Sequence, residues 1–331
     1  MYRQVVIISV AAEERKSILQ RWGNAQTVET VQQVLTGTGF ACQRMAASAP
    51  SDMSPIKGSE YLAFPNARHF RQPHQYLSDI LEEWEVPYIG SERKGHECAN
   101  KFVMKTRLCE AGIPTPKFQL LRHQAETERI ACIDGPYVLK PCTAAASLGV
   151  VRAASVQSAS EAAAQLAVDF GWPVIVETWS RHREFTVTTL GDGKQWYAFP
   201  LEIVVPPGAG YLTEEAKLLG AGKITTPVTD NALYHELTAL AKRTAEVLAL
   251  RDYARMEVLL NAAGQLLVID VNTLPGLKKH WSQLPMCLSV NVGLDYAESV
   301  LSVVAAAHLR LGIPLGPPLA DIWSRLTAVS G

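Results

Sequence analysis

The segment from Ala254 to Gly276 constrains the fold more than any other part of the chain, because two apolar runs there carry polar residues at regular intervals. The runs 256–260 and 266–271 flank a short stretch that ends at Gly264. Apolar runs of this length around a turn that ends in glycine predict a β-hairpin. Any fold assigned to the chain must therefore accommodate charged side chains on two adjacent strands.

The predicted register of this hairpin determines which side chains share a face. A turn centred on residues 262 and 263 pairs Leu260 with Gln265, and the same register sets Arg255 opposite Asp270. Opposed residues share a face, and side chains alternate along each strand. Four polar side chains are therefore expected on one face: Arg255, Glu257, Asp270 and Asn272.

The hairpin alone leaves two interpretations of this polar face open. It is either a solvated outer surface with an incidental ion pair, since charged groups usually lie in water, or a metal site. Two carboxylates and an amide oxygen suit Mg²⁺ when phosphate oxygens supply the remaining ligands. The turn from Thr273 to Gly276 would add backbone N–H groups beside the cluster, which favours a site for metal and phosphate.

Length and composition indicate a globular enzyme of two or three domains. The chain has 331 residues, 48% of them hydrophobic and 19% charged, with a net charge of −1. This balance gives no electrostatic case for a nucleic-acid or membrane partner. No apolar run approaches the roughly 18 residues of a membrane span, and the first run, 5–10, is too short for a secretory signal. We therefore expect a cytoplasmic protein, and six cysteines without C-x-x-C spacing argue against disulfides and zinc.

The first ninety-five residues read as a parallel α/β layer. Short apolar strands at 5–8 and 61–64 alternate with helical patterns, of which the second covers 27–36 and a later one covers 75–84. The first strand is not followed by G-x-G-x-x-G, so a dinucleotide site is not expected here. The apolar helix faces of such a domain would permit a homodimer.

The middle of the chain contributes lysines and a loop of small residues. Lys101 and Lys105 lie four apart on a helix predicted over 98–111, and so on one side of it. The loop 143–149 lies between two predicted strands and would let backbone N–H groups approach an anion. The alternative is an ordinary flexible hairpin tip, which the loop by itself does not exclude.

The remaining patterns predict a new sheet from Glu184, followed by a loop and helices. Long irregular loops inside compact domains are usually lids or binding loops. In chain order the predicted features are a loop at 206–222, a helix at 233–250, one helical stretch at 287–311 and a tail that begins at 314–318.

Several motifs at consistent spacing resemble the ATP-grasp ligases, and most closely the D-alanine–D-alanine ligase family. They are Y-I-G-S, G-I-P-T-P, L-K-P, S-L-G-V, E-F-T-V, E-A-K, R-M-E-V-L and I-D-V-N-T-L-P-G, within roughly residues 86 to 311. The resemblance implies an α/β (α+β) ATP-grasp fold with a Rossmann-like N-terminal domain, a small central domain and a C-terminal mixed-sheet domain. The expected boundaries are 1–95, 96–182 and 183–331.

The resemblance also implies where ATP would bind, between two sheets. The phosphates would be contacted by two lysines and by the loop that closes over them: Lys101, Lys140 and residues 143–147, including Ser147. The adenine edge and the ribose would be contacted by a second group: Glu177, the backbone of Thr178 and Ser180, and Glu184.

Two Mg²⁺ ions, with Mn²⁺ as a substitute, would be bound by Glu257, Asp270 and Asn272. The family more often has Asp at the first of these positions and Glu at the second, so the two carboxylates are exchanged here while the number of ligands is kept. Arg255 and the backbone N–H of Gly276 would stabilise the tetrahedral intermediate. Lys217 on the long loop would reach the transferred phosphate.

The substrate end departs from the family pattern. Glu14 matches the family's substrate-ordering glutamate, but other positions differ. Ala146 stands in place of a serine, Leu218 in place of a tyrosine, and Arg68 in place of a histidine. Trp281 stands in place of the second-substrate serine, beside a one-residue insertion and shortly after Lys278 and Lys279. Pockets built to hydrogen-bond one group reject analogues strongly, so these changes predict an altered specificity.

These observations predict an ATP- and Mg²⁺-dependent carboxylate–amine ligase that acts on small amino-acid-like substrates through an acyl phosphate. Its partners would be small-molecule carboxylates and amines. One alternative is a true D-alanine–D-alanine ligase of cell-wall synthesis. A second alternative, from another class, is a catalytically inactive ATP-binding regulatory module, which the missing serine and tyrosine favour.

Overall fold

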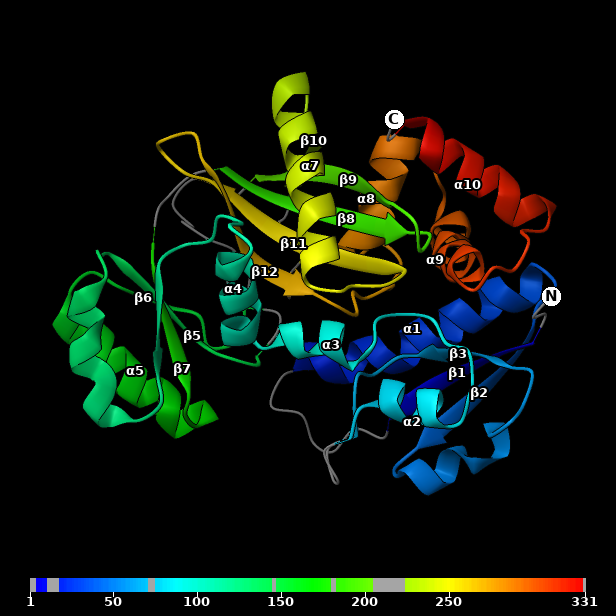
Figure 1. The fold of residues 1–331 in the computed structure, drawn as a ribbon, viewed down its shortest axis with the longest axis horizontal. Helices are drawn as coiled ribbons and strands as arrows, with labels where there is room; N and C mark the ends of the chain where they lie inside the picture. The colour runs from blue at the N-terminus through cyan, green and yellow to red at the C-terminus, as the bar shows by residue number, and fades with distance from the viewer. Residues whose placement is uncertain are drawn as a thin grey trace.

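The strands of the protein form three separate sheets. The computed structural model describes residues 4–10, 18–70, 75–144, 147–179, 183–204 and 224–329, without the side chains of 18–25 and 224. Figure 1 shows the three sheets in different parts of the molecule, with the N-terminal sheet and the sheet of residues 118–178 on opposite sides of α4. The α/β arrangement expected from the sequence, with a parallel N-terminal sheet followed by two further sheets, is confirmed.

The N-terminal sheet is parallel, in the order β2-β1-β3. Its elements are β1 (Gln4–Val10), α1 (Ile18–Gly37), β2 (Ala41–Ala47), the 3₁₀ helix η1 (Pro50–Ile56), β3 (Leu62–Pro65) and α2 (Leu77–Glu83). Strand β2 was not predicted from the sequence. Most of its residues are exposed or half-buried, so β2 lacks the apolar run by which β1 was predicted.

The central sheet is antiparallel, in the order β4-β7-β5-β6, and α5 covers one face of it. Ala163 and Leu166 of the helix share a core with Leu139 and Val176 of the sheet. The elements here are α3 (Arg93–His96), η2 (Glu97–Ala99), α4 (Lys101–Glu110), β4 (Phe118–Leu121), η3 (Gln124–Cys132), β5 (Tyr137–Pro141), β6 (Val151–Ala153), α5 (Val156–Phe170) and β7 (Val174–Thr178).

The start of α4 is determined by a side-chain cap. Asn100 Oδ1 accepts hydrogen bonds from the N–H groups of Phe102 and Val103, at 3.0 and 3.4 Å, which satisfies donors that a helix N-terminus leaves free. The N–H of Lys101 donates to Cys142 O at 2.8 Å, so the first turn of α4 lies against the end of β5.

The C-terminal sheet has the order β10-β9-β8-β11-β12, and its described pairings are all antiparallel rather than mixed. Its elements are β8 (Arg183–Gly191), β9 (Trp196–Val204), β10 (Ile224–Pro227), α7 (Asn231–Val247), β11 (Tyr253–Leu260) and β12 (Leu266–Asn272). On one face, Val187, Met256 and Val258 pack with Leu237 of α7.

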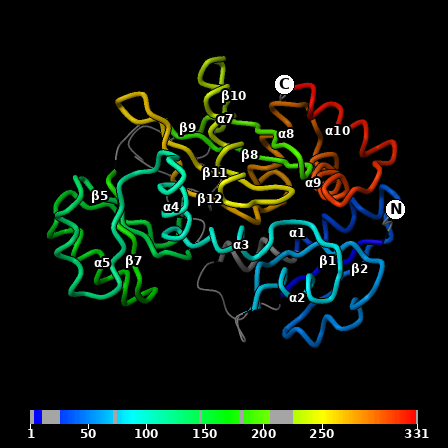
Figure 2. Tube along the Cα trace, in the orientation of Figure 1, coloured from blue at the N-terminus to red at the C-terminus, as the bar shows by residue number. Residues whose placement is uncertain are grey.

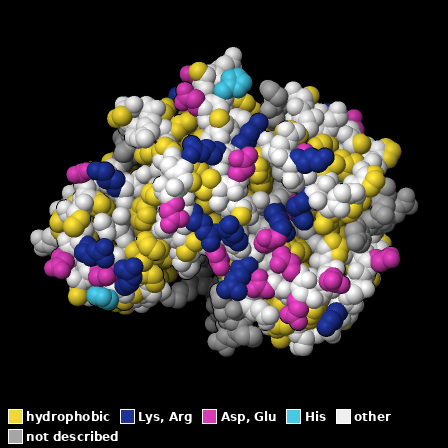
Figure 3. Space-filling model, viewed as in Figure 1, with side chains coloured by type: hydrophobic (Ala, Val, Ile, Leu, Met, Phe, Trp, Pro, Cys, Tyr) yellow, Lys and Arg dark blue, Asp and Glu magenta, His cyan; other side chains and the backbone are white. Residues whose placement is uncertain are grey.

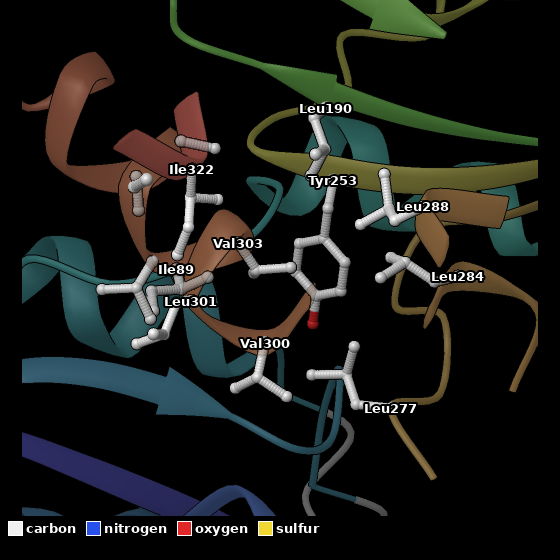
Figure 4. Packing of buried hydrophobic residues seen from close by; sticks show 14 of the residues in the cluster. Ile89, Leu190, Tyr253, Leu277, Leu284, Leu288, Val300, Leu301, Val303 and Ile322 are labelled. Atoms are coloured by element: carbon white, nitrogen blue, oxygen red, sulfur yellow. The ribbon is translucent and has the colours of Figure 1, made fainter. Parts of the chain in front are cut away.

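The opposite face of this sheet is apolar at one end and polar at the other. Tyr253 lies in a core with Leu284 and Leu288 of α8 and with Val300 and Val303 of α9, as Figure 4 shows. Because side chains alternate along a strand, the burial of Tyr253 on this side directs Arg255 and Glu257 to the same side. The core thus determines which way the polar residues of β11 face.

The C-terminal region consists of three helices: α8 (Gln283–Val292), α9 (Tyr296–Arg310) and α10 (Pro317–Val329). The single helical stretch predicted over 287–311 is wrong, because Gly293, at φ +76°, ends α8 in the left-handed conformation that glycine favours. The predicted tail is also wrong. Proline is tolerated at the start of a helix, and α10 buries Leu319, Ile322 and Leu326 in the same core as α8 and α9.

In the described part of the chain, no single helix is both long and apolar enough to cross a membrane. Only α8 and α9 taken together, across a bend of 99°, satisfy that test, by length and composition alone.

The N-terminal domain and the C-terminal sheet share one core. Val31 and Leu35 of α1 pack in the cluster that contains Val303 of α9, and Figure 2 shows α1 beside α9. A buried ion pair adds to this junction: Arg310 Nε lies 2.6 Å from Asp252 Oδ1, and the N–H of Gly90 donates to Asp252 Oδ2 at 2.7 Å. The junction positions the N-terminal domain beside the polar face of β11.

The surface on the side shown in Figure 3 carries acidic and basic side chains in alternation. This interspersion agrees with the near-zero net charge of the chain.

Candidate active site

The hairpin predicted at 254–276 is confirmed, but its predicted register is wrong. The N–H of Asn261 donates to Gln265 O at 2.9 Å, and Leu260 is the register partner of Leu266 rather than of Gln265. Asn261 Oδ1 accepts from the N–H groups of Ala263 and Gln265, at 3.0 and 2.9 Å. The loop therefore comprises residues 262–264 and ends at Gly264, whose φ of +75° suits a three-residue hairpin loop.

A β-bulge between Glu257 and Val258 compensates for this shift. Val258 pairs with Val268, whereas Glu257 pairs with Asp270, so Ile269 has no register partner on β11. A slip of one residue would turn every later side chain of β12 to the other face. The extra residue restores the alternation, and Arg255 pairs with Asn272 instead of with Asp270. The four polar residues share one face, as predicted.

The polar face is not a solvated outer surface. The side chains of Glu257 and Asp270 are 13% and 27% exposed. Arg255 Nη2 donates to Glu257 Oε1 at 3.1 Å, and Lys101 Nζ lies 3.5 Å from Asp270 Oδ1. Lys101 Nζ also donates to Ala144 O at 2.7 Å, so this lysine joins the loop of small residues to the hairpin.

The donor set of this face fits a hard divalent cation whose coordination is completed by a ligand. Glu257, Asp270 and Asn272 offer oxygen atoms only. Asn272 Oδ1 accepts from Leu274 N–H at 3.1 Å, which orients its amide at the start of the turn 273–276. Among the described residues, no group of three His, Cys, Asp or Glu side chains could hold a metal ion. Two carboxylates and an amide would hold Mg²⁺ only together with further oxygen ligands, which phosphate groups can supply.

Glu177 lies in a buried cluster of charges between α4, β5 and β7. Lys140 Nζ lies 3.0 Å from Glu177 Oε1, and Lys105 Nζ lies 3.4 Å from Oε2. The contact with Lys140 lacks hydrogen-bonding direction, and Oε1 has no hydrogen-bond partner among the described residues. A buried acceptor without a donor is costly, so this oxygen marks a place where a ligand donor fits.

The pKa values of the two lysines in this cluster are shifted in opposite directions. Burial lowers the pKa of Lys105 to about 8, although Glu177 acts to raise it. Burial also acts to lower the pKa of Lys140, but Glu177 and then Asp270 outweigh it, and the net change is upward. Lys105 was not predicted as a site residue. Its only sequence signal was its place one turn after Lys101 on the same side of the helix.

The polar face extends from the hairpin onto β8. Thr188 pairs with Arg255, Thr186 with Glu257, and Glu184 with Leu259, so Glu184 lies on the same face of the sheet as the predicted metal ligands. Three atoms here are buried without hydrogen-bond partners among the described residues: Thr186 Oγ1, Thr188 Oγ1 and Arg255 Nε. The two threonines were not predicted as site residues, because threonine is common in any strand.

The small-residue loop continues into a tight turn at 147–149. Ser147 has a φ of +62° and Gly149 one of +71°, and Ser147 O accepts from Val150 N–H at 3.2 Å. A Cβ atom at Gly149 would lie 2.8 Å from the ring of Phe170 and 2.9 Å from that of Pro141, so glycine is required for this close approach.

A serine hydroxyl lies beside Gly276, whereas the sequence placed Trp281 at the position where the family has its second-substrate serine. A Cβ atom at Gly276 would lie 2.9 Å from Ser282 Oγ. Lys278 N–H donates to Ser282 Oγ, and Ser282 N–H donates to Lys278 O, both at 2.9 Å. Because of the one-residue insertion, Ser282 rather than residue 281 precedes α8. The intervening Trp281 lies against Lys278, whose Nζ is 5.5 Å from the ring centroid.

The turn after Asn272 is held from the N-terminal side of the molecule by His96. His96 Nδ1 lies 3.0 Å from Thr273 Oγ1, and both residues are buried. The imidazole stacks on Tyr76, with a centroid separation of 6.5 Å. Burial, together with the charges of Arg68 and His69, lowers the pKa of His96 to about 3. His96 is therefore neutral near pH 7, and Arg68 lies close enough to influence it.

Several predicted site residues cannot be placed against this geometry. Glu14, Ser180 and Lys217 lie outside the described residues, as do Ala146 and Leu218. Thr178 is placed at the end of β7, where its hydroxyl is buried without a partner among the described residues.

Comparison with known proteins agrees with this arrangement. The family model of the D-Ala–D-Ala ligase C-terminus matches residues 108–305. The D-alanine–D-alanine ligase of Cupriavidus necator is 32% identical over 241 residues, which are 71% of this chain and 72% of that protein. The corresponding enzyme of Bordetella petrii is 30% identical, over 72% of this chain and 73% of that protein.

Solved structures share the fold at lower identity. The D-alanine–D-alanine ligase of Bacillus anthracis in complex with ATP has a TM-score of 0.73 and 17% identity, covering 93% of this chain and 99% of that chain. The VanG D-Ala:D-Ser ligase of Enterococcus faecalis has a TM-score of 0.73 and 17% identity, over 93% and 100%. Because the family model spans more than half of the chain and a curated relative is 32% identical over more than two thirds of its length, this chain belongs to the D-alanine–D-alanine ligase family, enzymes of the ATP-grasp class that form carbon–nitrogen bonds.

Proposed function

We propose that the protein is an ATP- and Mg²⁺-dependent ligase that joins two D-alanine molecules. The observation that carries the proposal is the single face on which Arg255, Glu257, Asp270 and Asn272 meet Lys101. The curated relatives named above favour D-alanine over the altered substrates predicted from the sequence. The hydroxyl of Ser282 beside Gly276 supports the same choice, since a serine was expected at the second-substrate end.

The reaction follows from the charges on this face. A carboxylate oxygen of the first substrate attacks the γ-phosphorus of ATP, the bond from that phosphorus to the bridging oxygen breaks, and ADP leaves. Lys101 and Lys140 bind and neutralise phosphate oxygens during this transfer. Mg²⁺, when bound by Glu257, Asp270 and Asn272, supplies further neutralisation and in-line orientation.

The second step is attack on the acyl phosphate. The amine of the second substrate forms a bond to the acyl carbon, phosphate leaves, and the nitrogen loses a proton. Negative charge develops on the former carbonyl oxygen, and Arg255 with the N–H of Gly276 would donate to it. Removal of one such donor typically costs about 10²–10³ in rate.

The experiment is ADP and phosphate release from ATP and Mg²⁺ against a panel of D- and L-amino acids. We expect turnover with D-alanine alone and a dipeptide product detectable by mass spectrometry. ATP binding without turnover on any amino acid would contradict the proposal and would favour the regulatory module. Arg255 contacts Glu257, and Asp270 lies opposite Glu257 on the neighbouring strand, which argues against loss of catalysis.

A second candidate is the altered-specificity ligase predicted from the sequence. It is favoured by Trp281 and Lys278 at the second-substrate end and by Arg68 near His96. Turnover with another amino acid at a kcat/KM above that for D-alanine would select it, because the same activation chemistry serves both candidates.

A further inference from the structure

Lys105 is a fully buried lysine to which the proposed reaction assigns no role. Its side chain has no exposed surface, and its Nζ lies 3.4 Å from Glu177 Oε2. It also lies over the ring of Phe118, 5.7 Å from the centroid. A buried charge must be compensated by partners, so a lysine retained here needs a reason beyond packing.

A second partner connects Lys105 to the other sheet of the site. Lys105 Nζ donates to Thr115 Oγ1 at 2.7 Å, and Thr115 Oγ1 donates to Val268 O at 2.8 Å. The N–H of Val268 donates in turn to Pro114 O at 2.9 Å. Val268 is the β12 residue immediately before the bulge that brings Asp270 opposite Glu257.

The three links form a continuous polar connection from β7 through α4 to β12. At one end is Glu177, whose Oε1 lacks a hydrogen-bond partner among the described residues. At the other end is the backbone of the metal hairpin. Lys101, one turn earlier on α4, contacts Asp270 directly. One helix thus places a lysine at each end of the proposed nucleotide site.

We propose that Lys105 is a positioning residue that restrains Glu177 Oε2 and thereby presents Oε1 to the 6-amino group of adenine. The proposal rests on the proposed function, because it requires ATP to bind against Glu177. Lys140 alone cannot position Glu177, because the proposed function assigns Lys140 to the phosphates. Its ion pair with Glu177 Oε1 also lacks the geometry of a hydrogen bond. Lys105 is one turn further from the phosphate end, and its polar contacts are with Glu177 and Thr115.

The direction of the effect follows from the charges. Without Lys105, Glu177 keeps Lys140 as its one cationic partner, 3.0 Å from Oε1, and turns toward it. That rotation removes the acceptor from the adenine edge. Burial brings the pKa of Lys105 to about 8, so the lysine is still protonated at neutral pH. The selectivity for adenine should therefore depend on Lys105 although it does not touch the nucleotide.

The test compares the binding of ATP and ITP by titration calorimetry in the presence of Mg²⁺. ITP presents an acceptor at position 6, where ATP presents a donor. The variants are Lys105→Met, Glu177→Gln and the double variant. The matched control is Lys117→Met, which removes a lysine from an ion pair in the same region. Lys117 Nζ lies 3.0 Å from Asp134 Oδ2, but the Lys117 side chain is 71% exposed.

We expect the wild type and Lys117→Met to prefer ATP over ITP, and Lys105→Met to lose about tenfold or more of that preference, as expected when a buried acceptor is misplaced. The double variant should lose no more than Glu177→Gln alone, because Lys105 acts through Glu177. KM for the amino acids should stay within about twofold, whereas a merely structural role would change both substrates' constants together.

The outcomes separate this proposal from the proposed function. If the wild type itself binds ATP and ITP with equal affinity, Glu177 does not recognise the 6-amino group of adenine. The proposed position of the nucleotide is then wrong. If the wild type prefers ATP and Lys105→Met keeps that preference, only the role of Lys105 is overturned. Should Lys105→Met not fold, Lys105→Gln removes the positive charge beside Glu177 while it keeps a polar side chain that can donate to Thr115. An unchanged ATP preference in that folded variant would equally overturn the role of Lys105.

Discussion

Glu257 of β11 is the register partner of Asp270 of β12, and the pair lies directly beside the β-bulge left by the unpaired Ile269. Without the bulge, the strand pairing set by the hairpin loop would place Asp270 opposite Met256, whose side chain packs on the other face with α7. One inserted residue thus decides whether the two carboxylates meet. The predictions below begin with this relationship.

Deletion of Ile269 should abolish ligation, because Asp270 and Asn272 would turn to the face that packs against α7. The substitution Ile269→Ala keeps the residue count and should retain most activity. Turnover is measured as ADP release, and folding is checked by circular dichroism. A folded, fully active deletion variant would show that the bulge does not determine the site.

Exchange of the two carboxylates should be tolerated, whereas their neutralisation should not. Glu257→Asp combined with Asp270→Glu restores the family's more common order with the same charge and ligand count, and we expect kcat within about tenfold of the wild type. Glu257→Gln and Asp270→Asn should each lower kcat about 10²-fold or more, with a raised Mg²⁺ requirement. The measurement is the rate as a function of Mg²⁺ concentration. Wild-type kinetics in either neutral variant would remove these residues from the metal site.

Arg255→Ala should lower kcat about 10²–10³-fold with little effect on ATP affinity, because the guanidinium is proposed to act on the developing oxyanion. Arg255→Lys, which keeps the charge, should recover part of the rate. Single-turnover kinetics and calorimetry with ATP separate the two effects. A loss confined to ATP affinity would assign Arg255 to the nucleotide instead.

The free energy of unfolding should decrease in acid, because His96 has a lower pKa in the folded protein than in the unfolded chain. Burial lowers the folded-state pKa of His96 from 6.5 to about 3, so between these values the unfolded chain binds a proton that the folded protein does not. Stability therefore decreases as pH falls from about 6.5 toward 3. Relative to His96→Gln, the wild type should lose about 2 kcal/mol between pH 7 and pH 5. Urea unfolding at both pH values tests this, and a constant difference between the two proteins would contradict it.

The junction between the N-terminal domain and the C-terminal sheet should depend on Asp252 and Arg310. Arg310→Met would leave the buried Asp252 carboxylate without its ion-pair partner, which should cost about 3–5 kcal/mol. The control at a more exposed ion pair, Arg325→Met, removes the partner of the half-buried Glu298 and should cost about 1 kcal/mol or less. Chemical denaturation measures both. Equal effects of the two variants would show that burial of Asp252 contributes nothing special.

The local patterns of the sequence predicted the main elements of the site. The apolar runs of the hairpin, the alternation that places Arg255 and Glu257 together, and the lysine spacing on α4 all depend on neighbouring residues, and all three are present in the structure. The hairpin register was wrong because the side chain of Asn261 accepts two hydrogen bonds that stabilise a loop of residues 262–264 instead of a turn centred on 262 and 263, and composition does not reveal these bonds.

Long-range contacts account for what the sequence did not show. The assignment of Trp281 overlooked Ser282, because a one-residue insertion changes which side chain meets Gly276 only once α8 is in place. Likewise, α10 looked like a tail because its apolar face has meaning only against α8 and α9.

By itself, the sequence determined the hairpin, the chemistry carried on its polar face and the family to which the chain belongs. Tertiary structure alone decided that the bulge at Ile269 brings Asp270 to Glu257, and that Lys105 reaches both Glu177 and Thr115. The reason is physical. Periodicity reports the face on which a residue lies within its own element, whereas register and burial depend on partners more than a hundred residues away, as with Thr115 and Val268.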